Sequence, residues 1–197
     1  MLDKNLNPII QFKEWFDLAS KKEINDPNAM CLSTVSQDNK PHSRMVLLKD
    51  FNEKGFIFYT NYESNKGKDI YSNVNVCLNF HWKSLLRQVR ITGKLSNVSD
   101  AEADSYYNSR SLGSRIGAWA SNQSSILESR DELIESIKEF KKKYSNEKNI
   151  PRPKHWSGWN LNPNEIEFWL DGKDRIHERL LYTRKDNNKW EKNLLSP

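Results

Sequence analysis

The chain has 197 residues and a formal net charge of +5, with 31 Lys and Arg against 26 Asp and Glu. Its seven Trp, seven Tyr and eight Phe can bury a large area, so the composition excludes a wholly disordered chain. No segment approaches the roughly 20 apolar residues of a membrane span, and the first residues have no signal-peptide core. The charge excess is compatible with a nucleic-acid surface, a pocket for phosphorylated ligands or solubility alone.

The length predicts one domain, and no repeat or linker divides the chain. The two cysteines, Cys31 and Cys77, are too few for a disulfide framework. Both lie among apolar residues, which predicts buried free thiols in a reducing cytoplasm.

The first predicted element is an amphipathic helix. Asn7 is a capping residue, and Pro8 is favoured at the first helical position. The helix is predicted to end near Lys22. Its apolar residues recur at helical spacing, namely Ile9, Phe12, Trp15, Phe16 and Ala19.

Short strands joined by turns follow the helix. Apolar and β-branched residues predict strands at residues 29–36, 43–48, 55–60, 74–82 and 88–95, with turns at 37–40 and 50–55. Pro41 is compatible with a strand only at its edge or start. This hairpin spacing favours an antiparallel sheet or barrel over a parallel α/β sheet.

Two helices and a hairpin complete the predicted elements. Ser99 and Glu102 form a capping box, which predicts a helix ending near Asn108. A longer surface helix with one apolar face is expected at residues 125–144. A strand at 165–170, a tight turn and a partner strand at 175–184 are predicted near the C-terminus.

Several kinds of catalytic site have no support in the sequence. There is no P-loop, no GxGxxG and no G-x-S-x-G, and the four histidines lack metal-ligand spacing. The sequence therefore predicts neither a metal site nor a hydrolase triad.

Cationic side chains interrupt several predicted strands. Arg44 and Lys49 bracket an apolar run, and Arg87 and Arg90 lie in another strand. Arg175, His177 and Arg179 would alternate on one strand face. Each run alone fits a solvated sheet face, whereas together they predict a pocket for anions beside aromatic residues such as Trp169.

Two polar segments allow two interpretations each. Residues 64–68 begin a predicted short helix, where free N–H groups favour phosphate, but they also fit an ordinary capped turn. Residues 106–115 combine hydroxyls with arginine, as a phosphate monoester site does, but they also fit a flexible polar loop.

Six segments, in order, resemble the pyridoxamine 5′-phosphate oxidase family: residues 44–49, 58–61, 87–89, 116–124, 166–169 and 175–179. The resemblance extends over residues 26–197. It implies a mostly β fold, an antiparallel FMN-binding split barrel with flanking helices, forming a homodimer with the flavin at the interface. The whole chain, 1–197, would be one such domain, with an N-terminal helix within 1–25 and C-terminal strands in 165–197 that complete the site.

The resemblance also implies an activity. The family oxidises pyridoxamine 5′-phosphate or pyridoxine 5′-phosphate to pyridoxal 5′-phosphate, with O₂ as the final electron acceptor and hydrogen peroxide as a product. The flavin supplies the redox chemistry, so no protein nucleophile or metal is required. A cytoplasmic enzyme of vitamin B6 biosynthesis and salvage is expected, with no nucleic-acid or membrane partner.

The family's binding residues map onto positions of this sequence. Substrate phosphate contacts are implied for Lys49, Tyr106, Arg110 and Ser114, and catalytic contacts with the pyridine ring for Arg175 and His177. Asn65 departs from the family pattern, which usually has a cation there. The implied FMN contacts are Arg44 and Lys66 at the phosphate, together with Met45, Val46, Leu47, Leu48, Lys49, Tyr59, Thr60, Asn65, Gln88, Gln123, Ser124, Trp169 and Arg179.

Three alternatives are weighed against this interpretation. A split-barrel flavoprotein with another substrate is disfavoured by the intact Arg175 and His177 pair. A non-catalytic carrier of flavin or pyridoxal phosphate would be expected to have broken substrate contacts. A nucleic-acid binder using a basic, aromatic sheet would not purify as a yellow flavoprotein.

Overall fold

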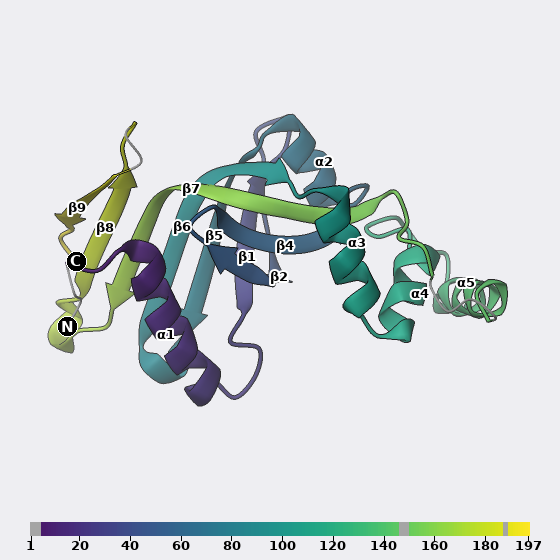
Figure 1. Cartoon of the computed structure of the whole chain (residues 1–197), viewed down its shortest axis with the longest axis horizontal. Coiled ribbons are helices and arrows are strands. Elements are labelled where there is room, and N and C mark those ends of the chain that lie inside the picture. Colours follow the sequence, from purple (N-terminus) through teal and green to yellow (C-terminus); the bar gives the residue numbers. More distant parts are fainter. Residues whose placement is uncertain (1–4, 146–149, 187–188) are drawn as a thin grey trace.

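The computed structural model describes residues 5–145, 150–186 and 189–197. Over these ranges one antiparallel sheet contains nine strands in the order β2-β1-β5-β6-β7-β4-β3, and β8 and β9 extend it from β7 (Figure 1). The strands are β1 (Ala29–Val35), β2 (Pro41–Leu47), β3 (Asp50–Asn52), β4 (Gly55–Asn61), β5 (Asn75–Trp82), β6 (Arg87–Asn97), β7 (Trp156–Leu170), β8 (Glu178–Arg184) and β9 (Trp190–Leu194). The α-helices are α1 (Pro8–Lys22), α2 (Asn65–Ser72), α3 (Asp100–Ser109), α4 (Leu112–Ala120) and α5 (Arg130–Lys143), and the 3-10 turns are η1 (Lys83–Leu85) and η2 (Lys173–Arg175).

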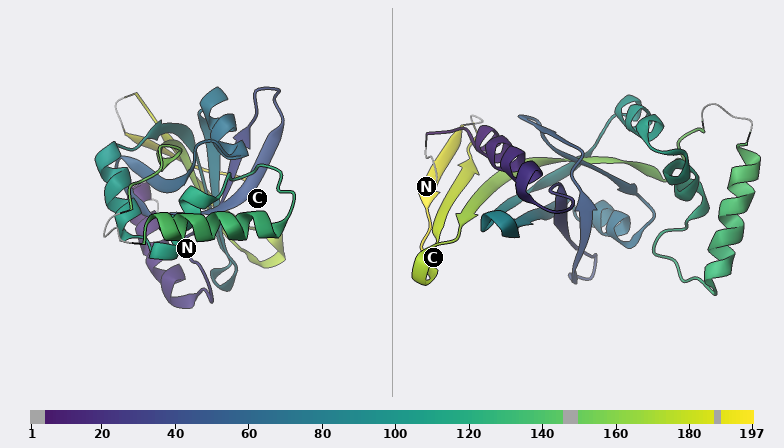
Figure 2. Two further views of the ribbon diagram at one scale, coloured as in Figure 1. Left: turned by 90° about the vertical axis from the view of Figure 1, so that its right-hand side faces the viewer. Right: turned by 90° about the horizontal axis from the view of Figure 1, so that it is seen from below.

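The longest strand, β7, determines the shape of the sheet. It pairs with β6 along most of its length, while its first part pairs with β4 and its last part pairs with β8. The sheet therefore divides at β7 and curls into a half-barrel, as the two views in Figure 2 show. The predicted fold class, an antiparallel split barrel with flanking helices, is confirmed.

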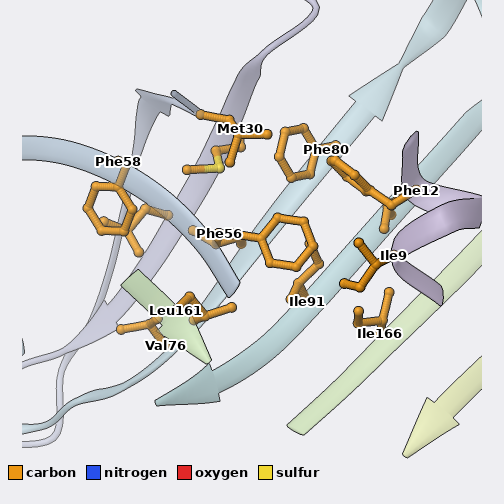
Figure 3. Packing of buried hydrophobic residues seen from close by; sticks show 14 of the residues in the cluster. Ile9, Phe12, Met30, Phe56, Phe58, Val76, Phe80, Ile91, Leu161 and Ile166 are labelled. Atoms are coloured by element: carbon orange, nitrogen blue, oxygen red, sulfur yellow. The ribbon is translucent and has the colours of Figure 1, made fainter. Parts of the chain in front are cut away.

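The main core lies between α1 and the inner face of the sheet (Figure 3). The Asn7 side chain accepts a hydrogen bond from the N–H of Ile9 and so begins the helix as predicted. Phe12 is fully buried, and its ring meets the rings of Phe56 and Phe80 edge-on at 5.0 Å and 5.2 Å.

The helices α3, α4 and α5 lie beyond the other end of the sheet (Figure 1). The capping box predicted at Ser99 and Glu102 is present. A small cluster of Ile116, Tyr144 and Ile150 joins α4 to the segment before β7. No helix in the described part of the chain is long and apolar enough to cross a membrane.

Several predicted boundaries differ from the structure. Residues 50–52 form β3 instead of a turn, and β7 begins at Trp156 instead of residue 165. The expected helix at 125–144 begins only at Arg130. Two elements, α4 and β9, were not predicted. Helix α4 occupies part of a segment that was interpreted as either a phosphate site or a loop, and β9 follows the last predicted strand. Both are short elements: α4 packs through Ile116 against Tyr144 and Ile150, and β9 forms by pairing with β8.

Candidate functional site

A cavity of about 750 Å³ opens where β2 and β4 meet α2, α3 and α4. We call it the central cavity. A second hollow, the side cavity, shares Met45, Lys66 and Gln123 with it. The central cavity is lined by Met45, Val46, Leu47, Lys49, Tyr59, Thr60, Asn61, Lys66, Tyr106, Arg110, Ser111, Ser114, Gly117, Ala118, Ser121, Gln123 and Trp156. The side cavity is lined by Pro41, His42, Ser43, Arg44, Met45, Asn65, Lys66, Gln123 and Ser124.

Two cations lie close together between the cavities. Lys66 Nζ donates hydrogen bonds to Ser64 Oγ at 2.9 Å and to Gln123 Oε1 at 2.8 Å. Burial, and then the charge of Arg44, lower the pKa of Lys66 to about 8. Because these cations disfavour each other in the absence of a ligand, a phosphate bound between them would relieve the repulsion. The position fits the phosphate of FMN.

The sequence predicts the start of α2 correctly. Ser64 is the N-cap residue in extended conformation, and its hydroxyl donates to the carbonyl oxygen of Asn61. Lys66 is therefore in the first turn of the helix, where free N–H groups also attract anions.

The opposite side of the central cavity has an aromatic wall. The ring of Tyr59 stacks on Tyr106 at 4.1 Å and on Trp156 at 5.4 Å. The guanidinium of Arg110 lies 4.6 Å from the Trp156 ring centroid, and Lys49 Nζ lies 5.9 Å from that of Tyr106. Buried Arg110 Nη1 has no hydrogen-bond partner among the described residues, so the structure supplies a donor for an anion there.

Helix α4 adds hydroxyl groups beside a second pair of cations, Lys49 and Arg110. The Ser111 side chain caps it by accepting a hydrogen bond from the N–H of Ser114, and the two hydroxyls lie 2.9 Å apart. The segment interpreted from sequence as either a phosphate site or a loop is thus an ordered helix start facing the cavity. The sequence analysis assigned no role to Ser111, although it lies in the polar segment 106–115, and none to Trp156, which lies outside every segment considered there.

Five of the predicted site residues lie elsewhere, at the other end of β7. Gln88, Trp169 and Arg179 are neighbours across β6, β7 and β8, so their side chains share one sheet face. The His177 ring lies 4.6 Å from the Trp169 ring, and its Nδ1 is 3.1 Å from Asp171 Oδ1. Together with Arg175 these residues form what we call the C-terminal cluster: Gln88, Trp169, Arg175, His177 and Arg179.

The predicted alternation of three of these residues on one strand face is wrong. Strand β8 begins only at Glu178, and Arg175 ends the 3-10 turn η2. Arg175 has a φ of 66° and is exposed. The turn after β7 is longer than a two-residue hairpin, so period-two reasoning does not apply to Arg175 or His177.

Two further residues predicted to contact FMN, Leu48 and Asn65, differ from the others in what their side chains can offer a ligand. The Leu48 side chain is 3% exposed and belongs to the core, so only its backbone is available to a ligand. Asn65 lines the side cavity without a charge, and the neighbouring exposed Lys68 does not line it.

A buried carboxylate supports the C-terminal cluster, and the sequence analysis gave it no role. Glu167 is 3% exposed and is bound by Arg90 and by Arg179, whose Nε donates to Oε1 at 2.8 Å. Its signal in the sequence is an acidic residue inside an otherwise apolar strand segment. Glu167 fixes the direction of Arg179, because a buried carboxylate requires its ion pair.

Comparison with known proteins identifies the family. Residues 16–144 match the family model described as pyridoxamine 5′-phosphate oxidase. Residues 156–197 match the model described as the pyridoxine 5′-phosphate oxidase C-terminal dimerisation region. The chain belongs to the pyridoxamine 5′-phosphate oxidase family. Membership confirms the predicted oxidoreductase class and the predicted FMN cofactor.

Individual relatives of this oxidase agree with that assignment. The pyridoxine/pyridoxamine 5′-phosphate oxidase of Pelagibacter ubique is 59% identical over 196 residues, covering 100% of this chain and 94% of the relative. The oxidase of the same name from Nostoc punctiforme is 52% identical, with 100% and 91% covered. Among solved structures, PhzG from Burkholderia lata in complex with tetrahydrophenazine-1-carboxylic acid has a TM-score of 0.91 at 29% identity, covering 99% of this chain and 95% of that one.

Proposed function

We propose that the protein oxidises pyridoxamine 5′-phosphate and pyridoxine 5′-phosphate to pyridoxal 5′-phosphate, with O₂ as the electron acceptor. O₂ is reduced to hydrogen peroxide, and water converts the oxidised amine to the aldehyde with release of ammonia. The observation that carries the proposal is the pair of anion subsites on the two adjoining cavities, Arg44 with Lys66 in the side cavity and Lys49 with Arg110 in the central cavity. Two phosphate-bearing ligands, FMN and the substrate, need two such subsites.

The chain's own side chains bind and orient the two ligands. FMN supplies a ring that accepts a hydride from the substrate carbon. Arg44 and Lys66 hold the FMN phosphate, with Gln123 and Ser124 beside them. Lys49, Arg110 and the Ser114 hydroxyl hold the substrate phosphate against the wall of Tyr59, Tyr106 and Trp156.

The site requires a second copy of the chain. Trp156 lines the cavity and Trp169 belongs to the C-terminal cluster, yet both lie on β7. At about 3.3 Å per residue their separation along the strand is roughly 40 Å, far longer than an FMN molecule. We therefore propose a homodimer in which the C-terminal cluster of one subunit completes the cavity of its partner, with FMN at the interface. The match of residues 156–197 to a dimerisation region supports this arrangement.

In this dimer Arg175 and His177 act on the substrate ring, and Gln88, Trp169 and Arg179 act on the flavin. The His177 ring lies 4.6 Å from the Trp169 ring at an interplanar angle of 41°, so the imidazole lies beside a flat aromatic surface. We propose the cytoplasm as the compartment, which suits the free thiols of Cys31 and Cys77.

A different substrate is the competing function, since the related PhzG structure holds a phenazine carboxylic acid. The second anion subsite favours a phosphate monoester, because a lysine, an arginine and a serine hydroxyl converge there. Turnover of pyridoxamine 5′-phosphate and of unphosphorylated pyridoxamine, followed by peroxide release, separates the two functions. Equal efficiency with both amines would contradict the proposal.

Mixing two defective variants tests the shared site. Arg110→Ala damages the cavity, and His177→Asn damages the C-terminal cluster and is expected to lower kcat/KM while FMN remains bound. If each site takes one part from each subunit, equal mixing of refolded or co-expressed chains restores about a quarter of the sites to wild type. If both parts came from one subunit, the mixture would be no more active than its components.

A further inference from the structure

The side cavity contains a group that the family resemblance does not assign. Asn65 provides no charge, yet His42 lines the same cavity together with Arg44 and Lys66. The His42 side chain is 44% exposed, so a bound ligand can reach it. It stands two positions before Arg44 on β2, which places both side chains on one face of that strand.

A buried carboxylate holds the His42 ring. His42 Nδ1 is 3.0 Å from Asp69 Oδ2, and Asp69 is 6% exposed on α2. Thr34 Oγ1 donates to the same oxygen at 2.6 Å, and Arg44 Nη1 donates to Thr34 Oγ1 at 2.7 Å. Burial alone would raise the pKa of Asp69, but the bonds from Thr34 and His42 and the charges of His42 and Arg44 outweigh burial and lower it.

This contact determines which nitrogen of His42 faces a ligand. Because Asp69 is ionised, Nδ1 carries a proton and donates it to the carboxylate. In neutral His42 the other nitrogen, Nε2, therefore has a lone pair, which repels phosphate oxygens. When His42 is protonated, Nε2 becomes a donor, and it has no other partner among the described residues.

We propose that His42 is a third phosphate-binding side chain for FMN and that its protonation makes cofactor binding pH-dependent. The cation missing at Asn65 is thereby replaced by an imidazole that carries a charge only when it is protonated. The proposal rests on the placement of the FMN phosphate between Arg44 and Lys66.

Other groups near His42 also titrate or carry charge. Lys66 and Asp69 face it from α2, Arg44 from β2, and Asp38 and Lys40 from the turn before β2. Lys66, with a pKa of about 8, and the phosphate itself, with a second pKa of about 6, change protonation in the same range. The informative quantity is therefore the difference between variants at each pH.

Flavin-fluorescence titration of the apo-protein with FMN at pH 6.5 and 8.5 tests the proposal. His42→Asn keeps a donor toward Asp69 and removes Nε2. We expect it to weaken FMN binding roughly threefold to tenfold at pH 6.5 and to match the wild type at pH 8.5. His42→Lys, charged at both pH values, should bind FMN more tightly than the wild type at pH 8.5.

Two controls separate the possible outcomes. Riboflavin lacks the phosphate, so His42→Asn should not alter its binding. A constant effect of His42→Asn at both pH values, or an equal effect on riboflavin, would overturn the proposal. A further variant, Lys66→Ala, tests the placement of the FMN phosphate between Arg44 and Lys66. If Lys66→Ala left FMN binding unchanged, that placement would be wrong.

Discussion

The central cavity and the C-terminal cluster are two parts of one proposed site, but they are built differently. The cavity collects side chains from β2, β4, α2, α3 and α4, and two of its cations, Lys66 and Arg110, are partly desolvated. The C-terminal cluster lies on one face of three adjacent strands and on a turn, with Arg175 exposed. The cavity is therefore preorganised within one subunit, whereas the cluster encloses a ligand only against an opposing surface.

The largest effect is expected where close backbone packing fixes the start of α2, the helix that carries Lys66. A Cβ at Gly67 would lie 1.9 Å from the carbonyl oxygen of Tyr62, so Gly67→Ala must displace the start of α2. We expect a loss of about 1–3 kcal/mol in the free energy of unfolding and a fall of more than about tenfold in FMN affinity. Thermal unfolding and FMN titration measure both quantities.

Gly113→Ala is the matched control, since a Cβ there meets nothing within 4 Å. It should change the free energy of unfolding by less than about 0.5 kcal/mol. If both alanine variants behaved alike, close backbone packing at Gly67 would not be what positions Lys66.

Arg110→Ala tests the substrate side of the cavity. Charge-assisted hydrogen bonds contribute about 1.5–3 kcal/mol each, so KM for pyridoxamine 5′-phosphate should rise about tenfold or more. FMN affinity should remain, because Arg110 lies in the other subsite. Steady-state kinetics with saturating FMN measures the change in KM. Arg130→Ala, at an exposed position at the start of α5, is the control and should leave KM unchanged.

Glu167→Gln tests whether the C-terminal cluster depends on its buried carboxylate. The change keeps the shape but removes the charge between Arg90 and Arg179, which should lower the free energy of unfolding by about 1–3 kcal/mol. Because Arg179 would lose its fixed direction, FMN and riboflavin should both bind a few-fold more weakly. A variant that lost stability but bound both flavins normally would show that Glu167 does not position Arg179 for the cofactor.

Asn65→Arg should give the smallest change. Asn65 is exposed at the start of α2 beside Lys66, and an exposed charge contributes about 0–1 kcal/mol. FMN binding should tighten severalfold at low salt and less at high salt. An unchanged dissociation constant at low salt would show that the asparagine is no deficit in this site.

The sequence predicts the parts of this fold that depend on local signals. The capped start of α1 at Asn7 and the capping box at Ser99 involve neighbouring residues, and both are confirmed. The start of β7 at Trp156 was missed, because Pro163 and several polar residues interrupt the apolar pattern there. The division of the predicted site into two groups follows from the length of β7, and no local pattern encodes it.

The position of β7 in the sequence also affects how the chain is made. This strand fills the space between β6 and β4, but it emerges from the ribosome after both of them. Until then each of those strands presents an open edge to other chains, and open edges favour aggregation. Truncation before residue 156 should therefore yield aggregates instead of a smaller folded domain, so the half-barrel can close only when synthesis is nearly complete.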